Sequence, residues 1–292
     1  MGNKMFQISG KNSTNIQISG DLIVGVSIES AKQIALNVFK DNFLELSEKA
    51  SNTALARAEE IVNEFISTLY EENQYVMDKL QEPAIQYSLF NVQREYAKTG
   101  DVGLKEQELK LLIARIGAKE RSLKQIILDE AIETLPKLSL EQLDFICYIF
   151  VVDNLTTKLL QKESDGQENI DTSDFLNKLS KFADFSSKNL RQHMIGHLQY
   201  LGCIREFSDS GKYFDSPINT IKLLIEKHCG YEVTDQNIVP ILKSINPNLA
   251  KYYRIWNMRR ERSIKLTTVG LVIAITHYNR QTNSDIRIDE FI

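Results

Sequence analysis

The sequence predicts a mainly α-helical protein: a short β-ribbon, a long helix that leads a helical bundle, and a smaller C-terminal α or α+β unit. Three observations lead to this fold class. The first 26 residues alternate apolar and polar side chains, which is the period of a strand. Residues 28–72 contain no glycine and no proline. Further helical segments with clear start and stop signals follow.

The predicted ribbon contains a doubled motif, because Gln-Ile-Ser-Gly occupies residues 7–10 and again 17–20. A two-stranded hairpin alone is marginally stable in water. The ribbon therefore either caps the helices of its own chain or pairs with copies in other chains. We predict association between copies, with Phe39 and Phe43 in support. The apolar residues expected to make this contact are Phe6, Ile8, Ile16 and Ile18.

Residues 27–162 are predicted to form the helical bundle, led by one helix over 28–72. Its apolar residues recur at steps of three and four from Ile34 to Leu69, which places them on one helix face. The alanine-rich middle of this segment would let a neighbouring helix approach closely. A helix this long either forms the spine of the bundle or pairs with a copy of itself.

Prolines, glycines and N-cap residues mark the helices that follow. Pro83 suits a first helical turn, Gly100 a helix end, and Pro136 closes another helix. Ser139 with Gln142 has the pattern of a capping box. The predicted helices span about 83–98, 104–116 and 122–135, with a fourth that opens at Ser139.

A polar stretch over residues 161–174 has one apolar residue, Ile170, and marks the expected boundary before the unit at 172–292. Helix, turn and hairpin signals over 189–215 resemble a winged helix. The elements expected here are helices at 173–184, 187–201 and 266–281, helices that open at Pro217 and Pro247, a hairpin at 203–214, and a strand around Ile286 and Ile288.

Composition narrows the classes of function. The chain has 292 residues, with 35 basic and 39 acidic side chains, so no global field attracts nucleic acid or an anionic membrane. Three widely spaced cysteines, Cys147, Cys203 and Cys229, predict reduced thiols and a cytoplasmic protein. The most apolar stretch, residues 266–278, is too short to cross a bilayer, so no membrane partner is expected.

Standard catalytic and cofactor motifs are absent from the sequence. It contains no glycine-rich phosphate loop, no dinucleotide fingerprint and no Gly-x-Ser-x-Gly. His193, His197 and Cys203 have a spacing that could start a zinc site, but a fourth ligand is missing nearby. We therefore predict no catalytic residue, no metal and no cofactor. An enzyme with a non-standard site is the third alternative for the function.

One concentrated basic stretch lies at residues 252–265, where arginines stand beside Tyr252, Tyr253 and Trp256. Such mixing suits phosphate contact with base stacking. It suits equally a helix that buries its aromatic side chains. The alternative function is therefore a nucleic-acid-binding regulator that uses Arg259, Arg260 and Arg262.

The segment "FQISGKN" resembles the RIP homotypic interaction motif of necroptosis and its bacterial amyloid-signalling counterparts. These share an aliphatic residue, Gln, an aliphatic residue, Gly and Asn. This chain has Ser9 inserted before the glycine, and Asp21 and Leu22 follow the second copy. The resemblance implies strand pairing between chains.

Most of the chain is similar to an uncharacterised bacterial family whose members begin with a Gly/Asn/Gln-rich repeat, then Gly-Asp and a long helix. The resemblance implies the fold and supplies no reaction. Proteins with such repeats often belong to bacterial conflict or phage-defence settings. The matching stretches are "NSTNIQISGD", "ALNVFKDNF", "REYAKTGD", "ERSLKQIILDEAIETLPKLSLEQL", "GHLQYLGC" and "KLTTVGLVIAI".

Together these observations predict an interaction protein of the bacterial cytoplasm that forms homo-oligomers. Its N-terminal ribbon would join copies, and its C-terminal unit would engage a protein partner. Nucleic acid is the alternative partner.

Overall fold

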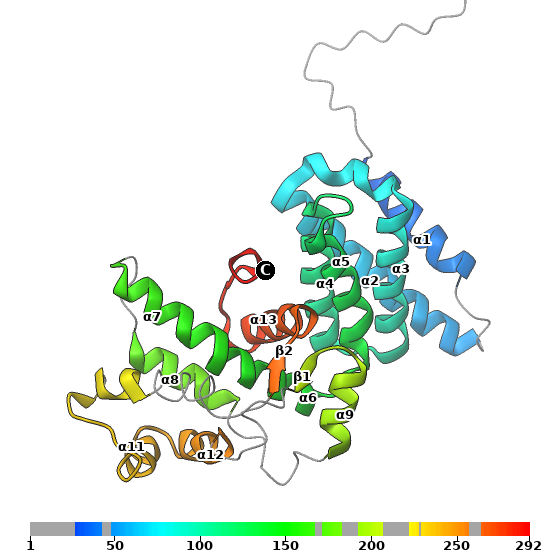
Figure 1. Cartoon of the computed structure of the whole chain (residues 1–292). Helices are drawn as coiled ribbons and strands as arrows, with labels where there is room; N and C mark the ends of the chain where they lie inside the picture. Colours follow the sequence, from blue (N-terminus) through cyan, green and yellow to red (C-terminus); the bar gives the residue numbers. More distant parts are fainter. Residues whose placement is uncertain are drawn as a thin grey trace, which may run out of the picture.

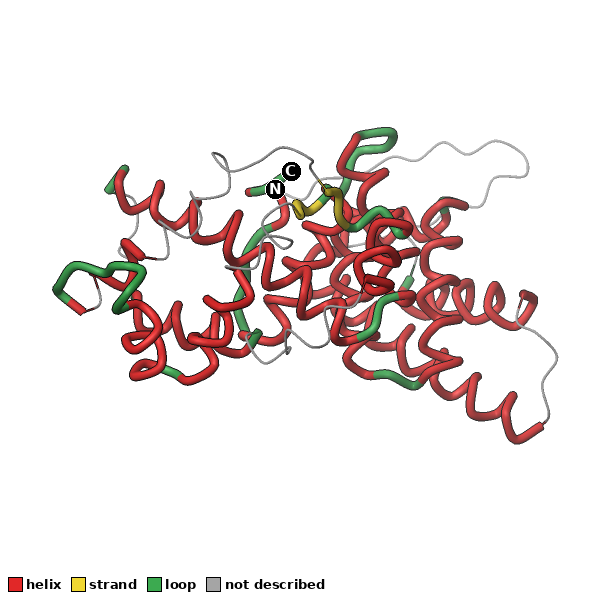
Figure 2. Tube along the Cα trace, turned by 60° about the horizontal axis from the view of Figure 1, so that its bottom comes forward, coloured by secondary structure: helices red, strands yellow, loops and turns green. Residues whose placement is uncertain are grey.

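The computed structural model is mainly helical, with one small antiparallel sheet among the residues it describes (Figures 1 and 2). The predicted ribbon at 1–26, Phe43, and Arg259, Arg260 and Arg262 lie outside the described residues, so what was expected of them stays a prediction. The described residues are 27–42, 48–166, 171–182, 192–206, 222–227, 229–256 and 264–292.

The predicted single helix over 28–72 was wrong, because two helices, α1 (Ile28–Asn42) and α2 (Glu48–Asn73), pack against each other there. Ala31 and Ala35 are buried on α1, and Ala54 and Ala58 on α2. Small side chains let helix axes come close. Packing the two helices together buries apolar surface that one extended helix would leave in water. No glycine or proline signals this break in the sequence.

The next three predicted helices are confirmed as α3 (Pro83–Thr99), α4 (Val102–Gly117) and α5 (Leu123–Thr134), after a 3-10 segment η1 (Gln74–Gln81). Gly100 ends α3 in the left-handed region, with φ +65°, where glycine has no Cβ to clash. The Asp101 and Ser122 side chains cap α4 and α5 by accepting from Leu104 N (3.0 Å) and Gln125 N (3.1 Å).

The helix predicted to open at Ser139 is also confirmed. It runs as α6 (Leu140–Ile149), a π-helical turn η3 (Phe150–Leu155) and α7 (Thr156–Ser164). Ser139 and Gln142 form the expected capping box. Residues 145–152 are completely buried, so α6 and the π turn pass through the core.

The last long helix, α13 (Thr268–Thr282), packs against α4, α5 and α6 near the middle of the molecule (Figure 1). Just before it, β2 (Ile264–Leu266) pairs antiparallel with β1 (Ile204–Glu206), with Ile204 opposite Leu266. The described strand of the expected hairpin at 203–214 thus pairs with a segment far along the chain. The tail predicted as a strand forms instead a 3-10 turn, η5 (Ile288–Glu290).

The remaining helices follow α7 along the chain: α9 lies beside β1, and α12 packs against both α8 and α11 (Figure 1). One hydrophobic cluster contains buried residues from Ala31 to Tyr278. The division into 27–162 and 172–292 and the winged-helix resemblance stay predictions, and α13 of the second unit packs on helices of the first. These helices are α8 (Thr172–Lys181), α9 (Gln192–Tyr200), α11 (Ile238–Ile245) and α12 (Pro247–Trp256).

Among the described helices, none has both the length and the apolar character needed to cross a bilayer.

Candidate functional site

Of the residues predicted to join copies, the structure describes Phe39. It is 2% exposed and lies in a small cluster with Ala54 and Ala58 of α2 and Ala97 of α3. Its ring centroid is 6.4 Å from that of Phe90. Phe39 therefore stabilises the packing of helices within its own chain and leaves no surface for a second copy.

Two residues of the basic stretch, Tyr253 and Lys265, contact acidic side chains of the same chain. Tyr253 is buried, and its hydroxyl donates to Asp235 Oδ1 at 3.0 Å, so its ring is not free to stack on a base. Lys265 Nζ lies 2.6 Å from Asp153 Oδ2 on the π turn. Burial raises the pKa of Asp153, against the opposing effect of Lys265. This ion pair ties β2 to η3.

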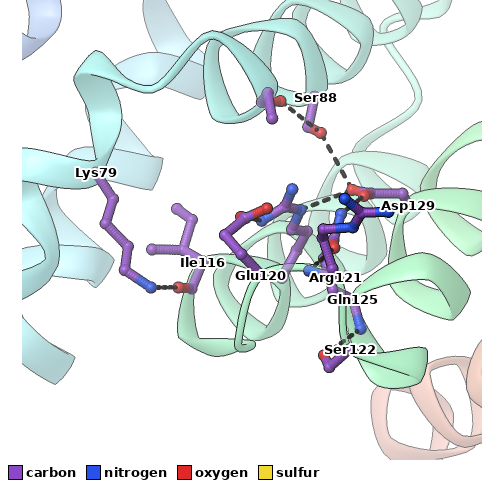
Figure 3. A network of polar contacts seen from close by, with 10 residues as sticks. Lys79, Ser88, Ile116, Glu120, Arg121, Ser122, Gln125 and Asp129 are labelled. Atoms are coloured by element: carbon purple, nitrogen blue, oxygen red, sulfur yellow. Dashed lines mark hydrogen bonds and ion pairs between the residues drawn. The ribbon is translucent and has the colours of Figure 1, made fainter.

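A polar network around Arg115 of α4 joins three helices (Figure 3). Arg115 is 1% exposed; its Nε donates to Asp129 Oδ1 at 2.7 Å and its Nη1 to Glu120 Oε1 at 2.9 Å. Asp129 also accepts from Gln125 Nε2 (2.6 Å) and from Ser88 Oγ of α3 (3.4 Å). We call these five residues the Arg115 network.

The turn from α4 to α5 builds this network. Arg121 adopts a positive φ of 57°, and its backbone N–H donates to Gln125 Oε1 at 2.7 Å. Lys79 donates to Ile116 O at 2.8 Å and fixes the end of α4 (Figure 3). Burial alone would lower the pKa of Arg115, but hydrogen bonds to Asp129 and Glu120 raise it. The guanidinium is therefore charged; it links α4 to α5, and Asp129 extends the link to Ser88 of α3.

A second buried group, His277 of α13, has the geometry of a carboxylate–imidazole pair. Its Nε2 lies 3.0 Å from Asp144 Oδ1, and its Nδ1 lies 3.1 Å from Gln107 Oε1. Gln107 Nε2 donates to Gly103 O at 2.9 Å, which turns the amide oxygen toward the ring. In a catalytic triad, the imidazole nitrogen that does not contact the carboxylate faces a nucleophile. Here it faces Gln107, so His277 holds α13 to α4 and α6.

Glu108 of α4 is a buried acid without a charge partner. It is 0% exposed, and neither carboxylate oxygen has a hydrogen-bond partner. Burial raises the pKa of Glu108 to about 9, so the group is protonated at neutral pH. Perturbed acids often mark active sites. Glu108 is enclosed in the helical core, which denies it contact with a substrate.

One turn earlier on α4, Lys105 lies between two carboxylates of α2. Its Nζ is 2.7 Å from Glu60 Oε1 and 2.6 Å from Glu64 Oε2. Tyr96 donates its hydroxyl to Glu60 at 2.9 Å, and its ring centroid lies 5.2 Å from Lys105 Nζ. Burial alone would lower the pKa of Lys105, but the hydrogen bonds to both carboxylates raise it.

His193, His197 and Cys203, whose spacing could have started a zinc site, lie in three different environments. His193 is exposed, and His197 Nδ1 lies 2.9 Å from Gln142 Nε2. Burial raises the pKa of the Cys203 thiol to about 12. Within the described part of the chain, no group of three or more His, Cys, Asp or Glu side chains is close enough to hold a metal ion.

Sequence patterns identified none of these polar clusters. Arg115, Glu108 and His277 lie among apolar residues at helical spacing, where a pattern shows a helix face and not its neighbours. The available signal was a charged or polar residue on an otherwise apolar face, as with Glu108 beside Leu109, Leu111 and Leu112.

Comparison with known proteins places most of the chain in one family. The model of a protein family of unknown function matches residues 25–228 and 215–292, and the match starts after the doubled Gln-Ile-Ser-Gly motif. Searches of curated proteins and of solved structures found no match. The chain therefore belongs to this family of unknown function.

Proposed function

We propose that this protein works by assembly, in which copies associate through residues 1–26 and the helical body engages a protein partner. One observation carries the proposal: the doubled motif at 7–10 and 17–20 precedes the family match, which begins at residue 25. The body has an apolar core of its own. The repeat therefore lies outside the part of the chain that the family model matches.

Physical chemistry favours association for such a repeat. A single hairpin is marginally stable, whereas identical strands from several chains bury their apolar sides together. Gln and Asn side chains can also stack in ladders between identical strands. The proposed contact uses Phe6, Ile8, Ile16 and Ile18, and the proposed setting is the bacterial conflict or phage defence that the resemblance implies.

Light scattering coupled to size exclusion tests the assembly. The full chain is expected to elute with a multiple of the mass of one chain. Replacement of Phe6, Ile8, Ile16 and Ile18 by serine in the full chain is expected to give the mass of one chain, because the apolar contact is lost.

The matched control replaces Lys4 and Lys11 by serine, two polar positions in the same segment, and is expected to keep the larger mass. Equal masses for the full chain and its four-serine variant would exclude residues 1–26 as the assembling segment.

A further inference from the structure

The C-terminal segment, residues 283–292, leaves α13 and crosses the region between α7 and the α4–α5 pair (Figure 1). Asn283, at φ +51°, ends the helix. The Asn279 side chain then holds the backbone of Ile286 at both groups: its Nδ2 donates to the carbonyl (2.8 Å) and its Oδ1 accepts from the N–H (2.9 Å). The segment is therefore anchored at its start.

Acidic residues of the C-terminal segment meet lysines from two helices. Asp289 pairs with Lys124 of α5. Glu290 Oε2 lies 3.2 Å from both Lys158 Nζ and Lys162 Nζ of α7. The hydrogen bond from Lys158 is the main cause that lowers the pKa of Glu290, so its carboxylate is charged at neutral pH.

Apolar residues of the segment alternate with these charges. Ile286, Ile288 and Phe291 are half-buried against the hydrophobic core. The Phe291 ring packs edge-on to Phe150, with centroids 5.3 Å apart, and Lys158 Nζ lies 4.2 Å from the Phe291 centroid. Residues 286–291, which make these contacts, have the sequence pattern aliphatic, any residue, aliphatic, acid, acid, aromatic.

The segment only partly fills the space it occupies. A cleft of about 410 Å³ on its α7–α8 side has an apolar wall of Leu159, Phe175 and Tyr278. A cleft of about 630 Å³ on its α4–α13 side has an apolar wall of Leu109, Ile113 and Ala114. Ile286 lines both clefts.

Lysines and acidic side chains of the body both line this surface, and Lys178 is paired within α8 with Asp174 at 2.8 Å. Lys158, Lys162 and Lys178 line the first cleft, and Lys110 and Lys124 line the second. The segment's own ion pairs involve three of these five. Exposed pairs of this kind contribute little free energy each, so they select the charge of an occupant more than they fix it in place.

We propose that the C-terminal segment is an internal stand-in for a partner: the surface formed by α4, α5, α7 and α13 binds an acidic peptide of another protein with the same apolar spacing, which displaces residues 285–292. The charge complementarity and the unfilled clefts support an acidic, partly apolar occupant. This names the partner surface of the proposed function, yet it does not depend on association through residues 1–26.

Displacement requires that the segment open more easily than the rest of the protein. It is held by the two Asn279–Ile286 hydrogen bonds at its start, and beyond them by one 3-10 turn, partly exposed ion pairs and half-buried side chains; Ile292 is 37% exposed. Segments with few buried contacts open at a lower free energy than the core does. The segment also competes at a high effective concentration, because it is tethered to its own binding surface.

Binding of a labelled peptide tests the proposal. The probe is the peptide SDIRIDEFI, the sequence of residues 284–292, measured by fluorescence anisotropy against full-length protein. In the variant Asp289→Lys/Glu290→Lys, the C-terminal segment carries positive charges that repel Lys124, Lys158 and Lys162, so its binding to the surface is weakened. This variant is expected to bind the peptide at least about tenfold more tightly than the unchanged protein, because its competitor is weakened.

Further substitutions in the same variant locate the binding surface. Adding Lys158→Glu and Lys162→Glu is expected to abolish peptide binding. Adding Lys49→Glu and Lys119→Glu, two exposed lysines outside these clefts, is the matched control and is expected to leave it unchanged. Equal affinity for the unchanged protein and a folded charge-reversed variant would overturn the proposal.

If the charge-reversed variant does not fold, a measurement on the unchanged protein tests whether the C-terminal segment can be displaced. In hydrogen exchange, the amides of residues 286–292 are expected to exchange well before those of α13, and equal protection would contradict displacement. Dimers that Asp289→Lys/Glu290→Lys abolishes would assign the surface to the segment of a second copy and also overturn the proposal. The four-serine variant tests residues 1–26 separately.

Discussion

Gly270 shows how a single missing side chain sets the position of α13. A Cβ at this residue would lie 1.9 Å from the backbone oxygen of Cys203. Thr267 N donates to the same oxygen at 3.0 Å. Two of the stretches that carry the family resemblance, "GHLQYLGC" and "KLTTVGLVIAI", therefore meet at this contact, and their sequence serves packing.

The substitution Gly270→Ala is expected to lower the free energy of unfolding by about 3 kcal/mol, because the backbone of residue 203 must move. Urea denaturation measures the change. Gly196→Ala is the matched control, since its Cβ would meet no atom within 4 Å. The control should be neutral or stabilising by up to about 1 kcal/mol. Equal effects of the two changes would contradict the close approach.

The raised pKa of buried Glu108 predicts that the free energy of unfolding falls as pH rises. Its pKa rises from 4.5 in the unfolded reference to about 9 in the folded protein. The folded state then binds more protons than the unfolded state between these values, so this group lowers stability as pH rises. The limiting slope for one proton is about 1.4 kcal/mol per pH unit.

Glu108→Gln removes this titration while keeping the shape of the side chain. We expect the variant to gain stability over the unchanged protein as pH rises from 5 to 8, measured as urea midpoints. A difference between the two proteins that stays constant across this range would show that Glu108 does not titrate as its burial requires.

At the scale of elements, the Arg115 network determines how α3, α4 and α5 meet. Arg115→Ala is expected to cost about 3 kcal/mol, because it leaves a cavity where a large side chain was fully buried and removes a charged hydrogen bond from Asp129. Lys119→Ala at the exposed turn is the control, with an expected change within about 0.5 kcal/mol. A similar shift in melting temperature for the two variants would contradict a role of the Arg115 network in the packing of α3, α4 and α5.

Helix ends were predictable from the sequence because their signals are local. Ser122, Ser139 and Gly100 act through their own side chain or backbone within one turn. The break between α1 and α2 had no such signal, because it depends on the tertiary packing of the two helices against each other. The pairing of β1 with β2 joins Ile204 to Leu266, a contact that no local pattern encodes.

At the scale of the whole molecule, the sequence predicted the helical class and the caps but not the central place of α13. Its even apolar character, from Val269 to Ala274, indicates burial on all sides. It does not say which helices provide that burial. The polar clusters were missed for the same reason, since Arg115 and Asp129, or His277 and Asp144, meet only in three dimensions.

We propose that residues 1–26 join copies of this protein, whose helical body matches the family model. The mass of the full chain in solution, measured by light scattering beside its four-serine variant, tests this most directly. We expect the unchanged protein to have a multiple of the mass of one chain. The variant in which Phe6, Ile8, Ile16 and Ile18 are replaced by serine is expected to have the mass of one chain. A full chain that is already monomeric at every concentration would contradict this proposal.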